Sequence, residues 1–240
     1  MTTFTKEAVK QLSAYLNEPD WMQEFRLAAF DKYAAMSMPT TSDEAWRRTD
    51  IRRVKLDKIG PSLNGDAGID AELPAFLGNT LTGDEAGGTM LQIDGVVKTF
   101  ELSDTLKEQG VIYCDMHTAV AQHPDLLKKY FMTEGVSVDE GKFAALHGAF
   151  WRGGTFLYVP KNVKASAPVH TVLWNTNGKT FTHTLVVLEE GAEAVFMDEY
   201  ASSERKERGL HNGAIELLVG DNANLIYAGL QDFGTNMVQF

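Results

Sequence analysis

Residues 187–196 read VLEEGAEAVF and residues 218–227 read LVGDNANLIY, so the same order of apolar strand, turn and apolar strand recurs 31 positions later. A weaker echo comes earlier, because Val159 to Val163 resembles Leu188 to Ala192 at an offset of 29. Repeats of this length are typical of β-solenoids, in which each coil buries its apolar face against its neighbours. The spacing predicts a parallel β-helix, and an antiparallel sandwich with evenly spaced strands is the alternative.

The repeat belongs to a β-rich region that follows Gly153-Gly154. No helical period interrupts its strand-forming runs, which are Phe156–Val159, Val169–Trp174, Phe181–Leu188, Ala194–Met197, Ala214–Val219 and Leu225–Tyr227. We therefore divide the chain into an N-terminal helical and hairpin region, residues 1–150, and a β-helix core, residues 151–240. The alternating run from Met237 to Phe240 has no turn or cap after it, so we expect the core to be incomplete at its C-terminal end.

The N-terminal region combines helices, a hairpin and a loop-rich insertion. Apolar residues at helical spacing predict two amphipathic helices, one over residues 6–16 and one that starts after Pro19. Glycines and prolines crowd residues 60–89, which predicts a long loop there. The Asp94-Gly95 pair between apolar runs predicts a tight hairpin, and two short helices are expected from Pro124 and over about residues 139–146.

Composition excludes several classes of protein. The chain has 33 acidic and 22 basic residues and a net charge of -11, which disfavours a nucleic-acid partner, because phosphate backbones are bound largely by Lys and Arg. Charged residues interrupt the apolar positions of the first thirty residues, so we expect no signal peptide, no membrane span and a cytoplasmic location. The single cysteine, Cys114, excludes an intrachain disulfide and a cysteine-only metal site.

Cys114 is the first candidate for chemistry, as a thiol that relays sulfur or ligates iron. Its neighbour Ile112 favours the simpler interpretation of a buried, small apolar side chain. His117 and His123 lie nearby in the sequence, but iron-sulfur clusters usually take four protein ligands and only one thiolate exists here. A complete metal site within this chain is therefore not expected.

The histidines and carboxylates of the β-rich region raise a second hypothesis. His170, His183 and His211 are predicted to be solvated or paired residues of the coils. The acidic sets Glu189, Glu190, Glu193 and Asp198, Glu199 suggest a rival class, the calcium-binding polysaccharide lyases. Turn carboxylates are usually solvated, and the sequence has neither a nucleophile elbow nor a Walker loop. We assign no catalytic, cofactor-binding or metal-ligating residue, and we expect no enzyme activity.

Three stretches resemble the SufB/SufD family of iron-sulfur cluster assembly scaffold proteins. Residues 143–161, FAALHGAFWRGGTFLYVPK, resemble the start of the family's β-helix, and residues 18–27, EPDWMQEFRL, resemble its opening helix. Residues 38–51, MPTTSDEAWRRTDI, resemble the Glu-x-Trp-Arg-x-Thr-Asp element of SufD, although Ala45 stands where an acidic residue is often seen. The early position of Trp46-Arg47 makes SufD a better match than SufB, which is the alternative.

Together with the repeat, the resemblance implies a right-handed parallel β-helix after residue 150, and it implies a non-enzymatic subunit of the SufB-SufC-SufD scaffold. In this family SufB and SufD pair through their β-helices, and a C-terminal helical domain docks the SufC ATPase. The sulfur-accepting cysteine, the cluster-associated histidine and the SufC-binding helices lie in the C-terminal part of the family's chains, which no position here matches. We therefore expect a chain that lacks the SufC-binding domain and binds no cofactor, while the full-length complex handles an iron-sulfur cluster. We also expect a homodimer through a C-terminal edge that exposes Ile226, Met237, Val238 and Phe240.

Overall fold

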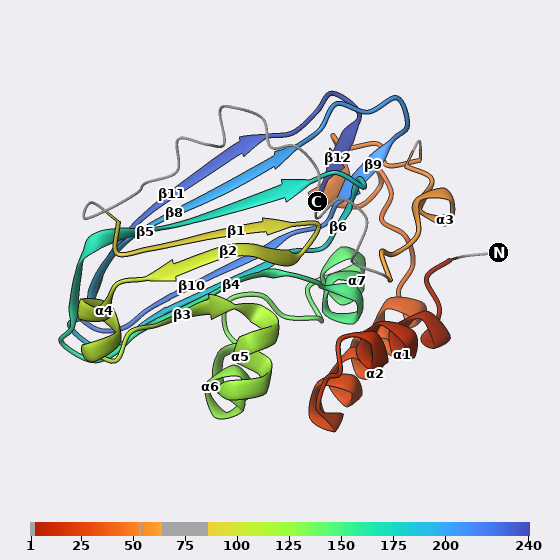
Figure 1. The fold of residues 1–240 in the computed structure, drawn as a ribbon. Coiled ribbons are helices and arrows are strands. Elements are labelled where there is room, and N and C mark those ends of the chain that lie inside the picture. The colour runs from red at the N-terminus through yellow and green to blue at the C-terminus, as the bar shows by residue number, and fades with distance from the viewer. Residues whose placement is uncertain (1–2, 53, 64–85) are drawn as a thin grey trace.

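The computed structural model describes residues 3–52, 54–63 and 86–240, so most of the predicted insertion at 60–89 lies outside the described residues. The described helices all come from the first 150 residues; most lie on one side of the sheets, and the short helix Asp104–Glu108 lies at one end of the strands (Figure 1). They are α1 (Lys6–Tyr15), α2 (Asp20–Ala35), the 3₁₀ turn η1 (Glu44–Trp46), α3 (Leu56–Ile59), α4 (Asp104–Glu108), α5 (Met116–Gln122), α6 (Pro124–Tyr130) and α7 (Lys142–Phe150).

The opening helices lie where their apolar spacing predicted them. Thr5 caps α1 by accepting a hydrogen bond from the Ala8 N–H, and the helix buries Val9 and Leu12. Pro19 precedes the first residue of α2, in extended backbone, and ends the break between the two helices. The predicted hairpin is also confirmed, because Asp94 and Gly95 both have positive φ angles between two strands that pair antiparallel.

Twelve strands of the described residues form three sheets, ordered β11-β8-β5-β1-β2, β10-β7-β4-β3 and β12-β9-β6. The strands are β1 (Gly88–Ile93), β2 (Val96–Leu102), β3 (Ile112–Asp115), β4 (Gly154–Val159), β5 (Lys164–Asn175), β6 (Lys179–Thr180), β7 (His183–Leu188), β8 (Glu193–Ser202), β9 (Gly209–His211), β10 (Ala214–Val219), β11 (Asn224–Asp232) and β12 (Met237–Gln239).

The prediction of a right-handed parallel β-helix is wrong. The sheets mix parallel and antiparallel strands: β1 pairs parallel with β5 but antiparallel with β2, and β3 pairs antiparallel with β4. Three of these strands, β1, β2 and β3, come from the first 150 residues. The spacing of runs after residue 151 could not reveal that strands from the helical region extend both large sheets.

The repeat in the sequence corresponds to the register of the parallel pairs. His183 of β7 pairs with Ala214 of β10, and Glu193 of β8 pairs with Asn224 of β11, each 31 positions further on. The earlier echo of 29 positions begins with the pairing of Val159 in β4 with Leu188 in β7, and Lys164 in β5 pairs with Glu193 at the same offset. Equivalent turns therefore stack at equivalent places, and apolar residues of successive strands face the same core.

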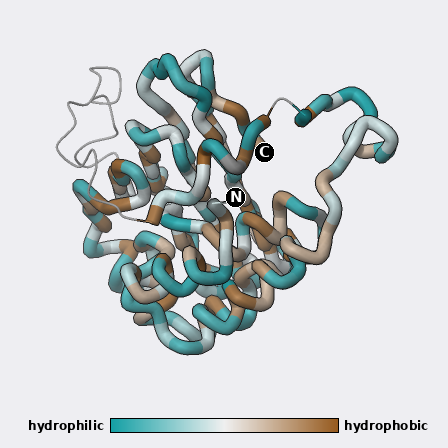
Figure 2. The backbone as a smooth tube through the Cα atoms, turned by 90° about the vertical axis from the view of Figure 1, so that its right-hand side faces the viewer, coloured by the Kyte–Doolittle hydropathy of each residue, from teal (hydrophilic) through white to brown (hydrophobic). Residues whose placement is uncertain are grey.

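Two cores flank the four-stranded sheet. Between it and the five-stranded sheet lie the buried side chains of Met90, Leu157, Val159, Val169, Val186, Leu188 and Phe196. Its other face packs against helices through Met22, Met116, Leu127, Phe131, Trp151, Phe156, Leu185 and Val187. The last residue of the chain, at the label C in Figure 2, packs against the core of the opening helices, and Phe240 stacks on Phe143 with ring centroids 3.9 Å apart.

A buried ion pair ties α2 to the segment that enters the sheets. Arg26 donates to both carboxylate oxygens of Glu18, at 2.7 and 2.6 Å, and also to the Ala149 carbonyl. The two charged side chains are 0% and 2% exposed, and the guanidinium lies 4.5 Å from the ring centroid of Trp151. Each charge depends on the other, because neither reaches water.

We predict that Glu18→Gln destabilises the protein by about 3–5 kcal/mol, because it leaves the Arg26 charge buried without its partner. Asp31→Asn is the matched control. It removes the carboxylate of the exposed Lys6–Asp31 pair and should cost less than about 1 kcal/mol. Urea denaturation measures both free energies of unfolding, and equal losses would show that Arg26 is solvated in the folded state.

Candidate functional site

A row of buried, hydrogen-bonded side chains crosses from the helices to the sheet edge. His147 of α7 lies 3.0 Å from His183 of β7, measured from Nε2 to Nδ1, and His183 Nε2 lies 2.9 Å from Glu216 Oε1 of β10. His147 Nδ1 lies 2.9 Å from the Asn212 carbonyl. All three side chains are buried, and burial, with the neighbouring His183, holds the pKa of His147 well below its usual value.

Glu216 reaches this row because successive side chains of β10 point to opposite faces of the sheet. Its neighbours in the strand face the core between the sheets, so the Glu216 side chain faces the helices. There its oxygens accept hydrogen bonds from the N–H groups of Met132 and Val136, at 2.8 and 2.9 Å. The backbone can approach this closely because residue 135 is glycine: a Cβ at Gly135 would lie 2.8 Å from Glu216 Oε2.

A second polar cluster lies in the core between the two large sheets. Asp198 Oδ2 accepts hydrogen bonds from the hydroxyls of Tyr200, at 2.6 Å, and Thr184, at 2.8 Å. Tyr227 lies 3.4 Å from the same oxygen, and Asp198 Oδ1 has no hydrogen-bond partner among the described residues. Burial raises the pKa of Asp198 to about 6, against the opposing effect of these hydroxyl donors.

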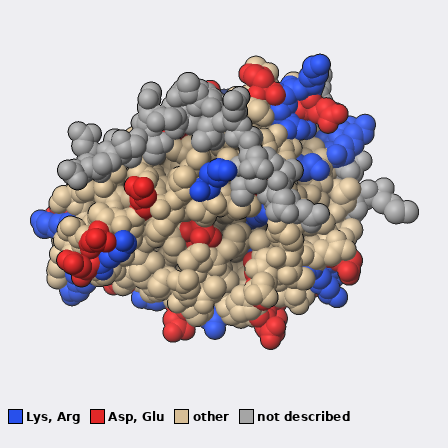
Figure 3. Space-filling model, in the orientation of Figure 1, with Lys and Arg blue, Asp and Glu red and all other residues tan. Residues whose placement is uncertain are grey.

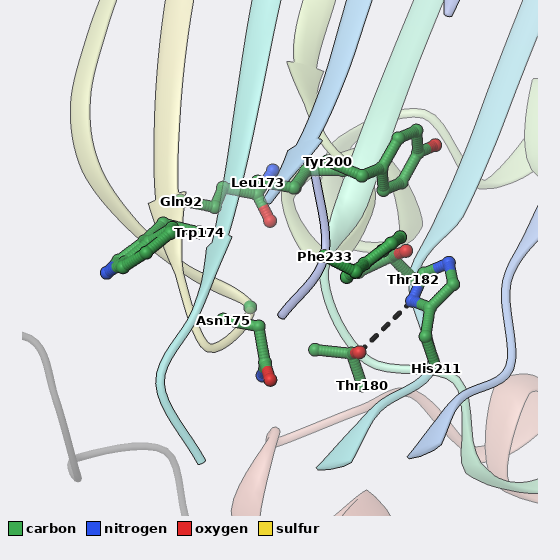
Figure 4. Close-up of a pocket in the computed structure, with 10 residues that line it drawn as sticks. Gln92, Leu173, Trp174, Asn175, Thr180, Thr182, Tyr200, His211 and Phe233 are labelled. Carbon is green, nitrogen blue, oxygen red and sulfur yellow. Dashed lines mark hydrogen bonds between the residues drawn. The ribbon is translucent and has the colours of Figure 1, made fainter. Parts of the chain in front are cut away.

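A cavity of about 10 Å³ lies beside this cluster, with room for one water molecule (Figure 4). His211 and Thr180 stand at its wall, joined by a hydrogen bond of 3.0 Å, and the ring of Phe233 lies 4.8 Å from that of His211. Burial lowers the pKa of His211 to about 4. The cavity is lined by Gln92, Gly95, Leu173, Trp174, Asn175, Thr180, Thr182, Tyr200, His211 and Phe233.

The structure separates Cys114, His117 and His123. Burial raises the pKa of the Cys114 thiol to about 12, which disfavours the thiolate that binds metals and accepts sulfur. His117 stacks on Trp151 and accepts a hydrogen bond from the Gly153 N–H, and His123 lies at the junction of α5 and α6. In the described part of the chain, no three His, Cys, Asp or Glu side chains lie where they could hold a metal ion.

The acidic residues that suggested a lyase do not converge either. Glu190 and Glu193 form exposed ion pairs with Lys161 and Lys164 at the turns. Asp198 lies inside the core, whereas Glu199 points out of the same strand beside His170. On the face shown in Figure 3, acidic and basic side chains are interspersed. These carboxylates therefore form no common site.

Sequence reasoning missed the residues that matter most in the buried row. His147 lies within an apolar helix and Glu216 within an apolar strand, AIELLV, where a lone ionisable residue signals a buried partner. His170, His183 and His211, predicted to be solvated or paired, are all buried in the structure. Every described group of the row is already hydrogen-bonded to another group. The row can therefore hold a proton and join α7 to β7 and β10, but it presents no open position to a substrate.

We predict that Asp198→Asn gains stability relative to the parent protein as pH rises from 5 to 8. The folded-state pKa of Asp198 lies above that of an unfolded aspartate, so stability is full below the unfolded value and is lost as pH rises through about 6. An amide does not titrate, so the difference should change by about 1 kcal/mol across this range. Denaturation at several pH values measures it.

Tyr200→Phe should change the pH dependence of stability in the opposite direction to Asp198→Asn. It removes a donor that favours the Asp198 carboxylate, so stability should fall more steeply as pH rises than in the parent protein. Identical pH profiles for the parent and Asp198→Asn would show that Asp198 is ionised throughout.

Comparison with known proteins identifies the family. Residues 6–171 match the family model described as SufBD protein N-terminal region. Residues 172–240 match the model described as SUF system FeS cluster assembly, SufBD core domain. Together the two models cover nearly the whole chain.

Curated relatives agree with these matches. The iron-sulfur cluster assembly protein SufD of Bacillus subtilis is 32% identical over 240 residues, which cover 98% of this chain and 54% of that protein. An iron-sulfur cluster assembly SufBD family protein of Staphylococcus aureus (strain USA300) is 29% identical over 249 residues, which cover 97% of this chain and 51% of that protein. The chain thus spans about half the length of the curated relatives it matches. It belongs to the SufBD family of iron-sulfur cluster assembly proteins and resembles SufD in sequence.

Proposed function

We propose that the chain is part of a SufD-like scaffold subunit for iron-sulfur cluster assembly and performs no catalysis itself. The observation that carries this proposal is the match of both SufBD models along one continuous chain. The buried row of His147, His183 and Glu216 supports it, because its described groups bond to one another and present no open position to a substrate. Residues 1–150 then supply the helical layer and the added strands, and residues 151–240 supply the repeated parallel strands.

The resemblance suggests SufB and SufC as partners in a cytoplasmic complex, with the cluster as cargo and not as a resident cofactor of these residues. Among the described helices, none is long and apolar enough to cross a membrane. A SufB-like role is the alternative assignment.

A chimera tests the proposed function. Residues 1–240 replace the matching half of B. subtilis SufD in cells that lack their own SufD. We expect the chimera to restore the activity of iron-sulfur enzymes in cell extracts, because the same fold then continues into the remaining half.

Gly154→Val in the chimera is the negative control. A Cβ at Gly154 would lie 2.0 Å from the His183 carbonyl oxygen, so this variant cannot pair β4 with β7. A folded, expressed chimera that leaves these enzymes inactive would refute the proposal.

The three sheets share an open end that suits association. Strands β10, β11 and β12 are each the last strand of a sheet. On β10, Ile215, Leu217 and Val219 continue the inward rows of Thr184, Val186 and Leu188 but remain between 37% and 46% exposed. Unpaired strand edges with apolar side chains recruit another chain. We call β10, β11 and β12 the open edge and propose that it pairs with a second copy when residues 1–240 are alone.

The residues expected to be exposed at this edge are only partly so. Ile226 is 56% exposed, whereas Met237, Val238 and Phe240 are half-buried. Phe240 packs against Trp46 and Phe143, so it closes the core of the N-terminal helices and is not free for a partner.

We predict that residues 1–240 form a dimer in light scattering and that Leu217→Lys raises its dissociation constant at least about tenfold, because a charge then replaces buried apolar surface. Phe100→Lys on β2, the opposite edge of the five-stranded sheet, is the matched control and should leave the dimer intact. A monomer at every concentration, or an equal change of the dissociation constant in both variants, would refute the open-edge contact. The family assignment would not be affected.

A further inference from the structure

The hydrogen bonds of the buried row determine how many protons it holds. The Asn212 carbonyl can only accept, so His147 Nδ1 carries a hydrogen. His147 is neutral, since burial lowers its pKa, and its Nε2 therefore accepts from the N–H of His183 Nδ1. At the other end, His183 Nε2 and Glu216 Oε1 lie 2.9 Å apart and must share one proton, because two lone pairs would otherwise face each other.

Counted beyond two neutral histidines and an ionised Glu216, one proton is all that the row can hold. Each ring nitrogen then has one partner, and the two Glu216 oxygens also accept the N–H groups of Met132 and Val136. A second proton would have to enter at His147 Nε2, opposite the N–H of His183. Removing the shared proton would leave a buried carboxylate facing the lone pair of His183 Nε2.

The surroundings oppose any change in this count. Besides His183, two charged or titratable groups act on His147. They are Arg26 of α2, which is ion-paired with Glu18, and His211 of β9. Together with His183, both disfavour a positive charge on His147. The rings of Phe131 and Trp151 pack on His183, with centroids 4.5 and 6.4 Å away. Low-polarity walls of this kind stabilise neither an extra cation nor an uncompensated anion.

The row joins elements that make few other polar contacts with one another. His147 belongs to α7, Met132 and Val136 to the segment between α6 and α7, and Glu216 to β10, a strand of the open edge. Asn212, before β10, adds a bond from its side-chain amide to the Phe143 carbonyl at the start of α7.

We propose that His147, His183 and Glu216 form a single-proton latch that holds α7 and the 132–136 segment on the edge strand β10. The latch is closed when the row holds one proton. In the open state the row is exposed to water, and two solvated imidazoles, with the ordinary pKa of about 6.5, hold one proton between them near that pH. The latch is therefore tightest near pH 6.5 and opens more often both above and below it.

Hydrogen exchange on the full chain tests the latch. We expect protection of the amides in residues 131–150 and 212–219, corrected for intrinsic exchange rates, to fall roughly tenfold between pH 6.5 and 8.5, because opening then releases the shared proton. Protection in β5 and β8 should not change. Uniform protection of all these segments over this range would overturn the proposal.

A plot of protection against pH should fall on both sides of pH 6.5, and we call these falls its alkaline and acid limbs. Two variants separate them. Glu216→Gln supplies an amide that donates to His183 Nε2, at the cost of the Met132 N–H bond to the same atom. The amide carries no titrating proton, so the fall above pH 6.5 should disappear even where overall protection is lower. His147→Gln cannot take up a second proton and should remove the fall below pH 6.5 in these segments alone. His211→Gln is the control, since His211 is buried but outside the row, and should leave the alkaline limb unchanged. A Glu216→Gln protein with the parent's alkaline limb would refute the latch.

Nitrogen-15 spectra of the histidine side chains provide a test that needs no variant. We expect His147 as the neutral Nδ1–H tautomer and His183 with a hydrogen on Nδ1. A hydrogen on His147 Nε2, or none on His183 Nδ1, would overturn the single-proton count.

Discussion

The parallel register that begins at Gly154 is the constraint on which the rest of the molecule depends. Gly154 pairs with His183, and His183 pairs with Ala214, so the first residues of β4, β7 and β10 stand in one row. Gly154 has a φ of +111° and lies against the His183 backbone, where no side chain fits. This contact sets the register of the four-stranded sheet, and that register decides which residues face the helices and which face the core between the sheets.

Register also explains why polar groups are buried in pairs. Register fixes which inward residues of the two facing sheets meet, as it does for Thr184 of β7 with Asp198 and Tyr200 of β8. Buried polar atoms need partners, so each polar residue in an inward row requires another beside it. A shift of register by one residue would leave each of them unpaired, so these clusters disfavour alternative pairings while contributing modest net stability.

The sequence predicted the parts of the fold that depend on local patterns. The helical spacing of α1 and α2, the Asp94-Gly95 turn and most strand runs were found where those patterns placed them. The failures concern long-range pairing. Nothing local in Ile112–Asp115 shows that it adds to β4, and nothing in residues 88–102 shows that a hairpin extends the five-stranded sheet. Sheet membership depends on tertiary contacts, so a solenoid inferred from spacing alone could not include these strands. His147 and Glu216 escaped notice for the same reason, since each acquires its partner only through the fold.

The perturbed polar groups and the exposed apolar strand edge lie in different parts of the described chain. Here the strongly perturbed groups, among them His147, Asp198 and Cys114, are enclosed, and each shifted pKa follows mainly from burial. The unsatisfied surface is instead the strand edge of β10, β11 and β12. Glu216 connects these two features, because it belongs to the open edge and also anchors the helical layer. A partner that pairs with β10 would therefore bind a strand whose position depends on the buried row behind it, which couples association at the edge to the internal packing of the helices.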